Sequence, residues 1–160
     1  MKRESKMPEM SHHQMVESVT RLLRERDFDG LDQLVHDDIV IETPQSRERI
    51  VGIANNRAVI EGAPGGAPRS SAKKVHGSAD AWVASPSFTL LRIAGSGDEY
   101  TTEEWVEYPN GEHGYGISLY QFRGDKIAKV TYYFAAPFPA AEWRASWVEM
   151  MPEHGQETRR

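Results

Sequence analysis

The residues of this sequence that are best suited to chemistry are a short acidic run and two tyrosines that follow it. The run Thr-Thr-Glu-Glu-Trp-Val-Glu over 101–107 contains Glu104, and Tyr120 and Tyr132 stand in two later apolar stretches. A carboxyl group in apolar surroundings has a raised pKa, which suits it to proton transfer near neutral pH. A tyrosine hydroxyl can hold a carbonyl oxygen or a developing enolate. One carboxyl and one phenol would suffice for a proton shift, a dehydration or an aldol-type closure.

Other chemistries lack the residues that they need. The chain has no cysteine, which excludes thiolate catalysis and disulfide bonds. No serine stands in a G-x-S-x-G motif, and no glycine-rich loop follows a strand and opens a helix. The spacing of the histidines does not resemble a metal site, because ligand pairs on a helix stand four residues apart. We therefore expect no metal and no cofactor.

The histidines have simpler interpretations. We expect His12 and His13 on the surface of the first helical turn, and His36 at a helix end or in a turn. His76 could reach the mouth of a pocket, although exposure at the surface explains it more simply. His113 follows a hairpin turn and is expected to point away from any interior.

Length and charge limit the class of protein. A chain of 160 residues can bury a core as one domain, which we place at 11–151, with flexible tails at 1–10 and 152–160. The net charge of -5 and the lack of a basic cluster outside the tails argue against nucleic acid as a partner. No apolar run reaches membrane length, and the first ten residues lack the apolar core of a signal peptide. We expect a soluble cytoplasmic protein with no membrane partner.

Three helices are predicted in the first part of the chain. The first begins at Ser11, a good cap residue, and carries apolar residues at helical spacing as far as Leu23. A turn at 27–30 leads into a short helix at 31–35, and the third helix runs over 53–61.

Two further segments combine proline with small residues. The stretch 62–68 ends the third helix and is either a lid over a site or a plain connector. A final helix is predicted over 140–151, after two prolines. It would carry Trp143 and Trp147 as a stripe packed against the sheet or against a second subunit.

The remaining pattern is that of β-strands. Strands are predicted at 39–43, 74–76, 81–93, 100–108 and in both halves of 112–134. The polar residues 45–49 predict a loop after the first strand. The last two strands form a hairpin, because Gly124 can adopt the positive φ of a tight turn. Helices that precede a run of antiparallel strands indicate an α+β fold, with helices on one face of a curved sheet that encloses a conical interior.

Two segments carry a resemblance to a known family. The segment DFDGLDQLVHDDIVIETP over 27–44 resembles the early part of the nuclear transport factor 2-like superfamily, in particular its ketosteroid isomerase and SnoaL-like branches. The segment 105–147, with WVEYPNG, FRGDKI and YYFAAPFPAAEWRASW, is similar to the end of SnoaL-like sequences. The resemblance covers most of 11–150. It implies a mostly antiparallel, mixed sheet wrapped around N-terminal helices to form a cone, which hosts isomerases, cyclases, hydrolases, dehydratases and non-catalytic proteins.

The catalytic positions of the family carry other residues here. The ketosteroid isomerase base, a carboxylate just before the proline, corresponds to Thr43, and Glu42 one residue earlier would face the other side of the sheet. The isomerase oxyanion tyrosine corresponds to Val19 and its aspartate to Ser118. The last strand lacks the aspartate of SnoaL-type cyclases, and the aspartate, arginine and aspartate set of related epoxide hydrolases is not recognisable.

The resemblance also implies which side chains face the interior, by strand alternation. On the strand at 100–108 it directs Thr102, Glu104 and Val106 inward, and Glu103 and Trp105 outward. The expected ligand-binding residues are Val19, Ile41, Thr43, Val106, Ser118, Tyr120, Val130 and Phe134. The candidate catalytic residues are Glu104 and Tyr132.

Two functions remain open. One is a cofactor-free acid/base enzyme of the isomerase, cyclase or dehydratase type that acts on a small hydrophobic carbonyl compound. The other is a ligand-binding or interaction domain that has lost the catalytic acids of the family. A buried Glu104 that faces a cavity and is not paired with an arginine would favour the enzyme. Glu104 in a salt bridge on the outer face, or a cavity filled by Phe134 and Tyr132, would exclude it.

The outer face of the sheet suggests a homodimer. It would carry the apolar residues Trp105, Tyr115, Ile117, Leu119 and Tyr133, which suit a second sheet better than water. Members of the superfamily that the chain resembles commonly pair through this face.

Overall fold

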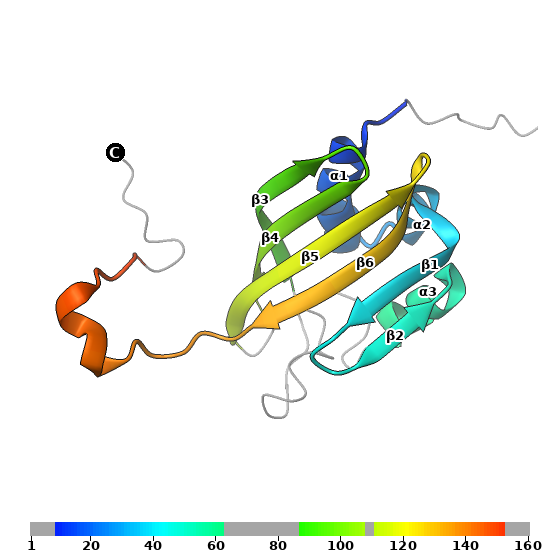
Figure 1. Cartoon of the computed structure of the whole chain (residues 1–160). Helices are drawn as coiled ribbons and strands as arrows, with labels where there is room; N and C mark the ends of the chain where they lie inside the picture. Colours follow the sequence, from blue (N-terminus) through cyan, green and yellow to red (C-terminus); the bar gives the residue numbers. More distant parts are fainter. Residues whose placement is uncertain (1–8, 63–86, 108–110, 153–160) are drawn as a thin grey trace, which may run out of the picture.

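The computed structural model describes residues 9–62, 87–107 and 111–152, and Figure 1 shows their arrangement. The helices are α1 (His12–Glu25), α2 (Phe28–Leu34) and α3 (Ile53–Glu61). The strands are β1 (Val35–Thr43), β2 (Glu48–Val51), β3 (Ser87–Ser96), β4 (Glu99–Glu107), β5 (His113–Arg123) and β6 (Lys126–Ala135), and a short 3-10 helix, η1 (Glu142–Trp147), follows. The predicted α+β architecture is confirmed.

The strands form one curved, mixed sheet in the order β2-β1-β6-β5-β4-β3. β1 runs parallel to β6, and all other neighbours are antiparallel. The three helices lie on one face, behind the sheet as Figure 1 is drawn. We call this the inner face and the opposite one the outer face. In the part of the chain that the structure describes, no helix is long and apolar enough to cross a membrane.

The core lies between the helices and the inner face. Apolar side chains recur at helical spacing along α1, and they meet inward residues of β1, β5 and β6. The fully buried members include Val16 of α1, Leu34 of α2, Ile39 of β1, Tyr120 of β5 and Ile127 of β6. This packing fixes the helices against the same face that carries the candidate site.

Local signals explain how α1 begins and ends. The Ser11 hydroxyl accepts a hydrogen bond from the Gln14 backbone N–H at 3.2 Å, and the Gln14 side chain accepts one from the Ser11 N–H at 2.9 Å. This reciprocal pair is a capping box. The helix ends at Arg26, which adopts the left-handed conformation with φ of 61°. The predicted start at Ser11 is confirmed.

His12 holds two hairpin turns against the start of α1. Its Nδ1 lies 2.7 Å from the Gly97 carbonyl oxygen, and its Nε2 lies 2.9 Å from the Gly124 carbonyl oxygen. Its ring stacks on Phe122 with centroids 3.8 Å apart. The prediction of a plain surface residue is therefore wrong for His12, because partners 85 and 112 residues away are invisible to local sequence patterns.

The β5–β6 hairpin forms as predicted. Gly124 adopts φ of 66° in the turn. Along β5 the even-numbered residues from Gly114 to Phe122 are buried, and the odd-numbered ones are exposed or half-buried. The hairpin therefore separates an inner face from an outer one.

The region around β1 differs from the prediction in three ways. β1 begins at Val35 rather than at residue 39, so His36 lies in the strand, with Nε2 2.6 Å from the Arg123 carbonyl oxygen. α2 begins at Phe28, because the Asp27 side chain caps it by accepting from the Gly30 N–H. The segment predicted as a loop contains β2, whose charged residues pair with β1 in the register Thr43 to Glu48. Cross-strand pairing overrides the polar sequence there.

The end of the chain also differs. The helix predicted over 140–151 is reduced to the six residues of η1, and Trp143 and Trp147 are 76% and 78% exposed. They do not pack on the sheet of their own chain. A helix this short needs tertiary packing to persist, and the described residues provide none for it.

Several predictions lie outside the described residues. They are the proposed lid over 62–68 beyond Gly62, the strand at 74–76, the first part of the strand at 81–93, and the outer parts of both tails.

We expect Ser11→Ala to lower the free energy of unfolding by about 1 kcal/mol, because it removes the cap of α1. Urea denaturation followed by circular dichroism measures the change. Ser18→Ala is the matched control, since the Ser18 hydroxyl bonds only the Gln14 carbonyl within the helix and alanine favours a helix interior. Equal losses in the two variants would contradict the capping role.

Candidate active site

Three neighbouring strands bring the candidate residues onto one patch of the inner face. Glu104 of β4 stands opposite Gly116 of β5, which stands opposite Phe134 of β6. In the next row Thr102, Ser118 and Tyr132 are aligned in the same way. Residues aligned across strands share a face. The register therefore assembles one cluster from three separate parts of the sequence.

Glu104 is the buried carboxyl group of this cluster, with only 3% of its surface exposed. The Thr102 hydroxyl donates to Oε1 at 3.1 Å, and the Ser118 hydroxyl donates to Oε2 at 3.3 Å. Among the described residues no lysine or arginine forms an ion pair with it. Burial raises the pKa of Glu104 above its ordinary value, and the two hydroxyl donors only partly oppose this shift.

Gly116 makes room for this carboxyl group. A Cβ atom at position 116 would lie 3.2 Å from Glu104 Oε2 and 3.4 Å from Val106 Cγ2. The first distance is tighter than an ordinary contact, so a side chain at position 116 would press on the carboxyl group of Glu104.

Two tyrosines complete the cluster. Tyr120 is 1% exposed, and its hydroxyl oxygen is buried without a hydrogen-bond partner of good geometry. Burial raises the pKa of Tyr120 well above its ordinary value, with smaller contributions from Tyr132 and Glu104, and the nearby hydroxyl groups of Ser118 and Thr102 oppose the shift in part. Burial, with a smaller contribution from Glu104, likewise raises the pKa of Tyr132. Both phenols therefore stay protonated, as hydrogen-bond donors, near neutral pH.

The other expected site residues surround the cluster or the core beside it. Phe134 stacks on Tyr132 with ring centroids 5.9 Å apart. Val106 is buried beside Gly116. The apolar residues Val19, Ile41 and Val130 belong to the packed core below it. Thr43, at the end of β1, is half-buried.

Glu42 lies on the opposite side of the sheet, where Arg49 and Lys129 each approach its carboxylate to 2.8 Å. Hydrogen bonds from Lys129 and Arg49 lower the pKa of Glu42. The one-residue offset from Thr43 thus produces a surface ion pair rather than an interior acid.

Thr102 is a candidate site residue whose inward position the sequence predicts but whose contact with Glu104 it does not. It was expected to face inward, yet its hydroxyl was given no role. The sequence signal for this contact is the spacing of Thr102 and Glu104, because residues two apart on a strand project from the same face. A hydroxyl two positions before an inward carboxyl group can orient that group.

The expected cavity beside Glu104 stays a prediction. Two shallow surface hollows are found, of about 470 and 390 Å³. The first is lined by residues around His12 and Gly124, and the second lies between β2 and α3. Neither is lined by Glu104 or by the two tyrosines. The described residues also contain no group of three side chains that could hold a metal ion.

Comparison with known proteins gives the following matches. The SnoaL-like domain model matches residues 16–130. An NTF-2 like protein of unknown function from Burkholderia xenovorans LB400 is 30% identical, with a TM-score of 0.68 over 87% of this chain and 94% of that one. No curated protein matches the sequence.

Two more distant structures share the fold. A putative ketosteroid isomerase from Kribbella flavida DSM 17836 is 16% identical, with a TM-score of 0.68 over 89% of this chain and 90% of that one. An LEH-like epoxide hydrolase from M. tuberculosis is 18% identical, with a TM-score of 0.56 over 77% of this chain and 81% of that one.

We expect the stability of the protein to depend on pH through Glu104. Because its folded pKa is raised, the folded state binds more protons than the unfolded state between the two pKa values. The contribution is fully present below the ordinary pKa of 4.5 and is lost as the pH rises through the folded pKa. The free energy of unfolding of the wild type minus that of Glu104→Gln should fall across this window, by at most about 1.4 kcal/mol per pH unit.

Urea denaturation at a series of pH values measures this difference. Glu103→Gln is the matched control, because Glu103 is the next residue on β4 and is half-exposed on the outer face. A difference for Glu104→Gln that stays flat or rises with pH would contradict the burial of an ionisable carboxyl group at this position.

Proposed function

The chain belongs to the SnoaL-like domain family, and we propose that it is a cofactor-free acid/base enzyme that binds a small hydrophobic carbonyl compound against the inner face of its sheet. Glu104 is the proton-transfer group. Tyr120 and Tyr132 are the donors that hold the carbonyl oxygen. The catalytic residues of the best-known branches of the fold are replaced, so the chemistry rests on this cluster alone.

The observation that carries the proposal is a buried carboxyl group near a buried phenol whose hydroxyl has no partner of good geometry. An unsatisfied buried hydroxyl is costly, by about 1–3 kcal/mol. No group among the described residues bonds the Tyr120 hydroxyl with good geometry, although the side chains of Ser118, Thr102 and Tyr132 lie near it. A ligand oxygen would satisfy it, and the apolar surroundings that include Phe134 and Val106 suit the rest of a hydrophobic molecule.

The chemistry follows from the charge states. Ionised Glu104 removes a proton from the carbon next to the carbonyl group, and the electron pair moves onto the carbonyl oxygen. The neutral phenols of Tyr120 and Tyr132 donate hydrogen bonds to that oxygen as it becomes an enolate. Protonated Glu104 then gives its proton back. Delivery to another carbon gives isomerisation, delivery to a β-hydroxyl group that leaves as water gives dehydration, and delivery to the alkoxide formed when the enolate carbon attacks a second carbonyl group gives ring closure.

A second candidate function is ligand binding without catalysis. It is supported by the replacement of the isomerase carboxylate, tyrosine and aspartate by Thr43, Val19 and Ser118. It is also supported by the two hydroxyl groups that already bond both oxygens of Glu104. A carboxyl group held in this way could be a structural part of a binding site.

We expect the protein to catalyse exchange of α-protons with solvent deuterium in a panel of hydrophobic ketones, enones and β-hydroxyketones. Glu104→Gln should lower the exchange rate by about 10²–10⁴-fold, because it removes the proton acceptor and keeps the shape. Tyr132→Phe should lower it by about 10²–10³-fold, the usual loss for one oxyanion donor. Mass spectrometry measures the exchange, and calorimetry measures binding of the same compounds.

The matched controls are Glu103→Gln and Tyr133→Phe, which change the neighbouring residues of the same type on the outer face. They should leave exchange and binding unchanged. Binding without exchange, equal in the wild type and in Glu104→Gln, would establish the second candidate instead. Failure of every compound to bind would overturn both.

A further inference from the structure

The segment after β6 is an arm that exposes an unusual amount of apolar surface. It leaves the sheet after Ala135 and carries η1 at a distance from the body, as the orange and red part of Figure 1 shows. Its large apolar residues Phe138, Trp143, Trp147, Met150 and Met151 are between 76% and 82% exposed. Single exposed apolar residues are common, but a contiguous cluster of this kind marks an interaction surface.

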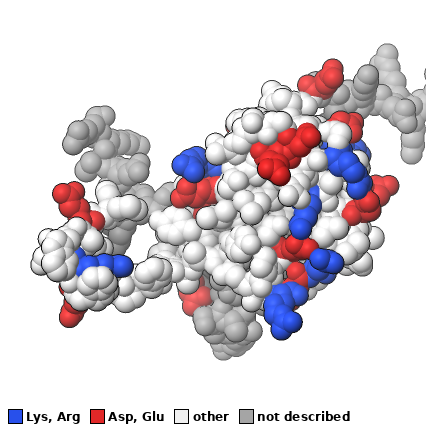
Figure 2. Space-filling view, viewed as in Figure 1, with Lys and Arg blue, Asp and Glu red and all other residues white. Residues whose placement is uncertain are grey.

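The outer face of the sheet is a second uncovered apolar surface. Ile117 and Leu119 of β5 and Tyr133 of β6 are 42%, 38% and 41% exposed, and Ile117 stands opposite Tyr133. Trp105 is less open than expected, because it is 9% exposed beside the rings of His113 and Tyr115. Figure 2 shows an uncharged patch on this face, with acidic and basic side chains above it and to its right.

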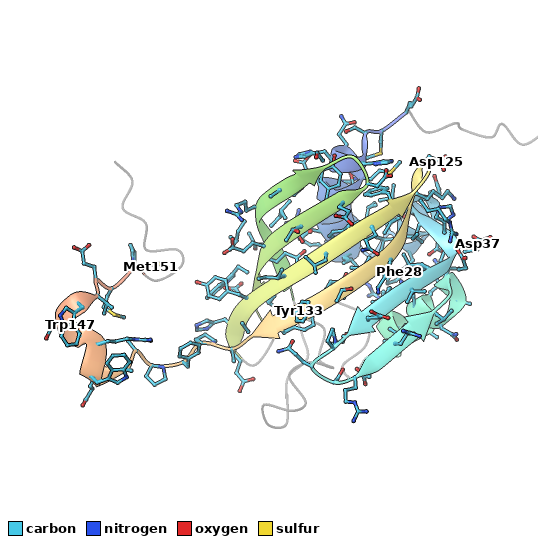
Figure 3. The ribbon with its side chains drawn as sticks, viewed as in Figure 1. Phe28, Asp37, Asp125, Tyr133, Trp147 and Met151 are labelled. Carbon is cyan, nitrogen blue, oxygen red and sulfur yellow. The ribbon has the colours of Figure 1, made fainter. Side chains whose placement is uncertain are left out.

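The arm begins next to the outer face but does not cover it. Tyr133 lies two residues before the end of β6, so the arm starts at the border of the outer face. Figure 3 places Tyr133 on the sheet, and Trp147 and Met151 on the arm, apart from it. An arm that starts at this border and extends away from its own sheet is available to a neighbouring molecule.

We propose that the arm of residues 137–151 packs across the outer face of a second copy of the chain, whose arm packs across the first in return. Such an exchange is symmetric, as expected for a twofold dimer in which the same surfaces meet in both directions. The exposed apolar side chains of the arm and those of the outer face would cover each other.

The size of the arm fits this role. A buried aromatic side chain usually covers about 150–250 Å². Because Phe138, Trp143 and Trp147 are now 81%, 76% and 78% exposed, covering them would remove roughly 350–600 Å² from water on each copy. A standard interface buries about 800 Å² per partner. The arm would therefore supply roughly half of a stable interface or more, and tryptophan is a frequent source of binding energy at such contacts.

The first test is the oligomeric state. Sedimentation velocity at micromolar concentration should show a dimer for the wild type. Trp143→Ser combined with Trp147→Ser should raise the dimer dissociation constant about 100-fold or more. The control Val59→Ser changes an exposed apolar residue of α3 and should leave the dimer intact. A monomeric wild type, or a dimer that the double variant does not weaken, would overturn the proposal.

The second test asks which chain the arm contacts. The sequence has no cysteine, so single cysteines can be placed freely. Ser146→Cys in the arm and Thr131→Cys on the outer side of β6 are made in two differently tagged chains, which are mixed and treated with a short thiol crosslinker. A covalent heterodimer is expected. Crosslinking confined to one chain, in a variant that carries both cysteines, would show an arm folded onto its own sheet and would overturn the exchange.

Discussion

The register of β4, β5 and β6 is the constraint on which the candidate site depends. It aligns Glu104 with Gly116 and Thr102 with Ser118, so that two hydroxyl groups reach the carboxyl group and a missing side chain leaves room for it. A slip of one residue in any of these strands would turn its side chains to the other face. The chemistry of the inner face is thus set by backbone pairing as much as by residue type.

Contacts outside the central strands hold this register. His12 ties the β3–β4 and β5–β6 turns to the start of α1. At the other end of the sheet, Gln45 ties the segment after β1 to β6. Its side-chain amide donates a hydrogen bond to the Phe134 carbonyl oxygen and accepts one from the Phe134 N–H, each at 2.6 Å. Both side chains fix the ends of strands that carry the site.

The two faces of the same strands have opposite roles. The inner face carries a cluster of hydroxyl groups and one carboxyl group within an apolar core, where burial shifts every pKa of the cluster upward. The outer face carries exposed apolar residues and a margin of ion pairs such as Glu42 with Arg49. Strand alternation lets neighbouring residues such as Tyr132 and Tyr133 serve these two surfaces separately.

The sequence by itself determined the fold class, the start of α1, the β5–β6 hairpin and the alternation of its faces, because these follow from local periodicity, capping and turn residues. Only the tertiary structure decided that residues 48–51 form a strand, that His12 bridges two turns and that Thr102 and Ser118 bond Glu104. Those features depend on partners distant in the sequence. The arm shows that a local pattern can also mislead when its tertiary partner is missing. Its helical pattern predicted a packed helix over 140–151, but the helix is only six residues long. In the described chain no surface covers Trp143 and Trp147.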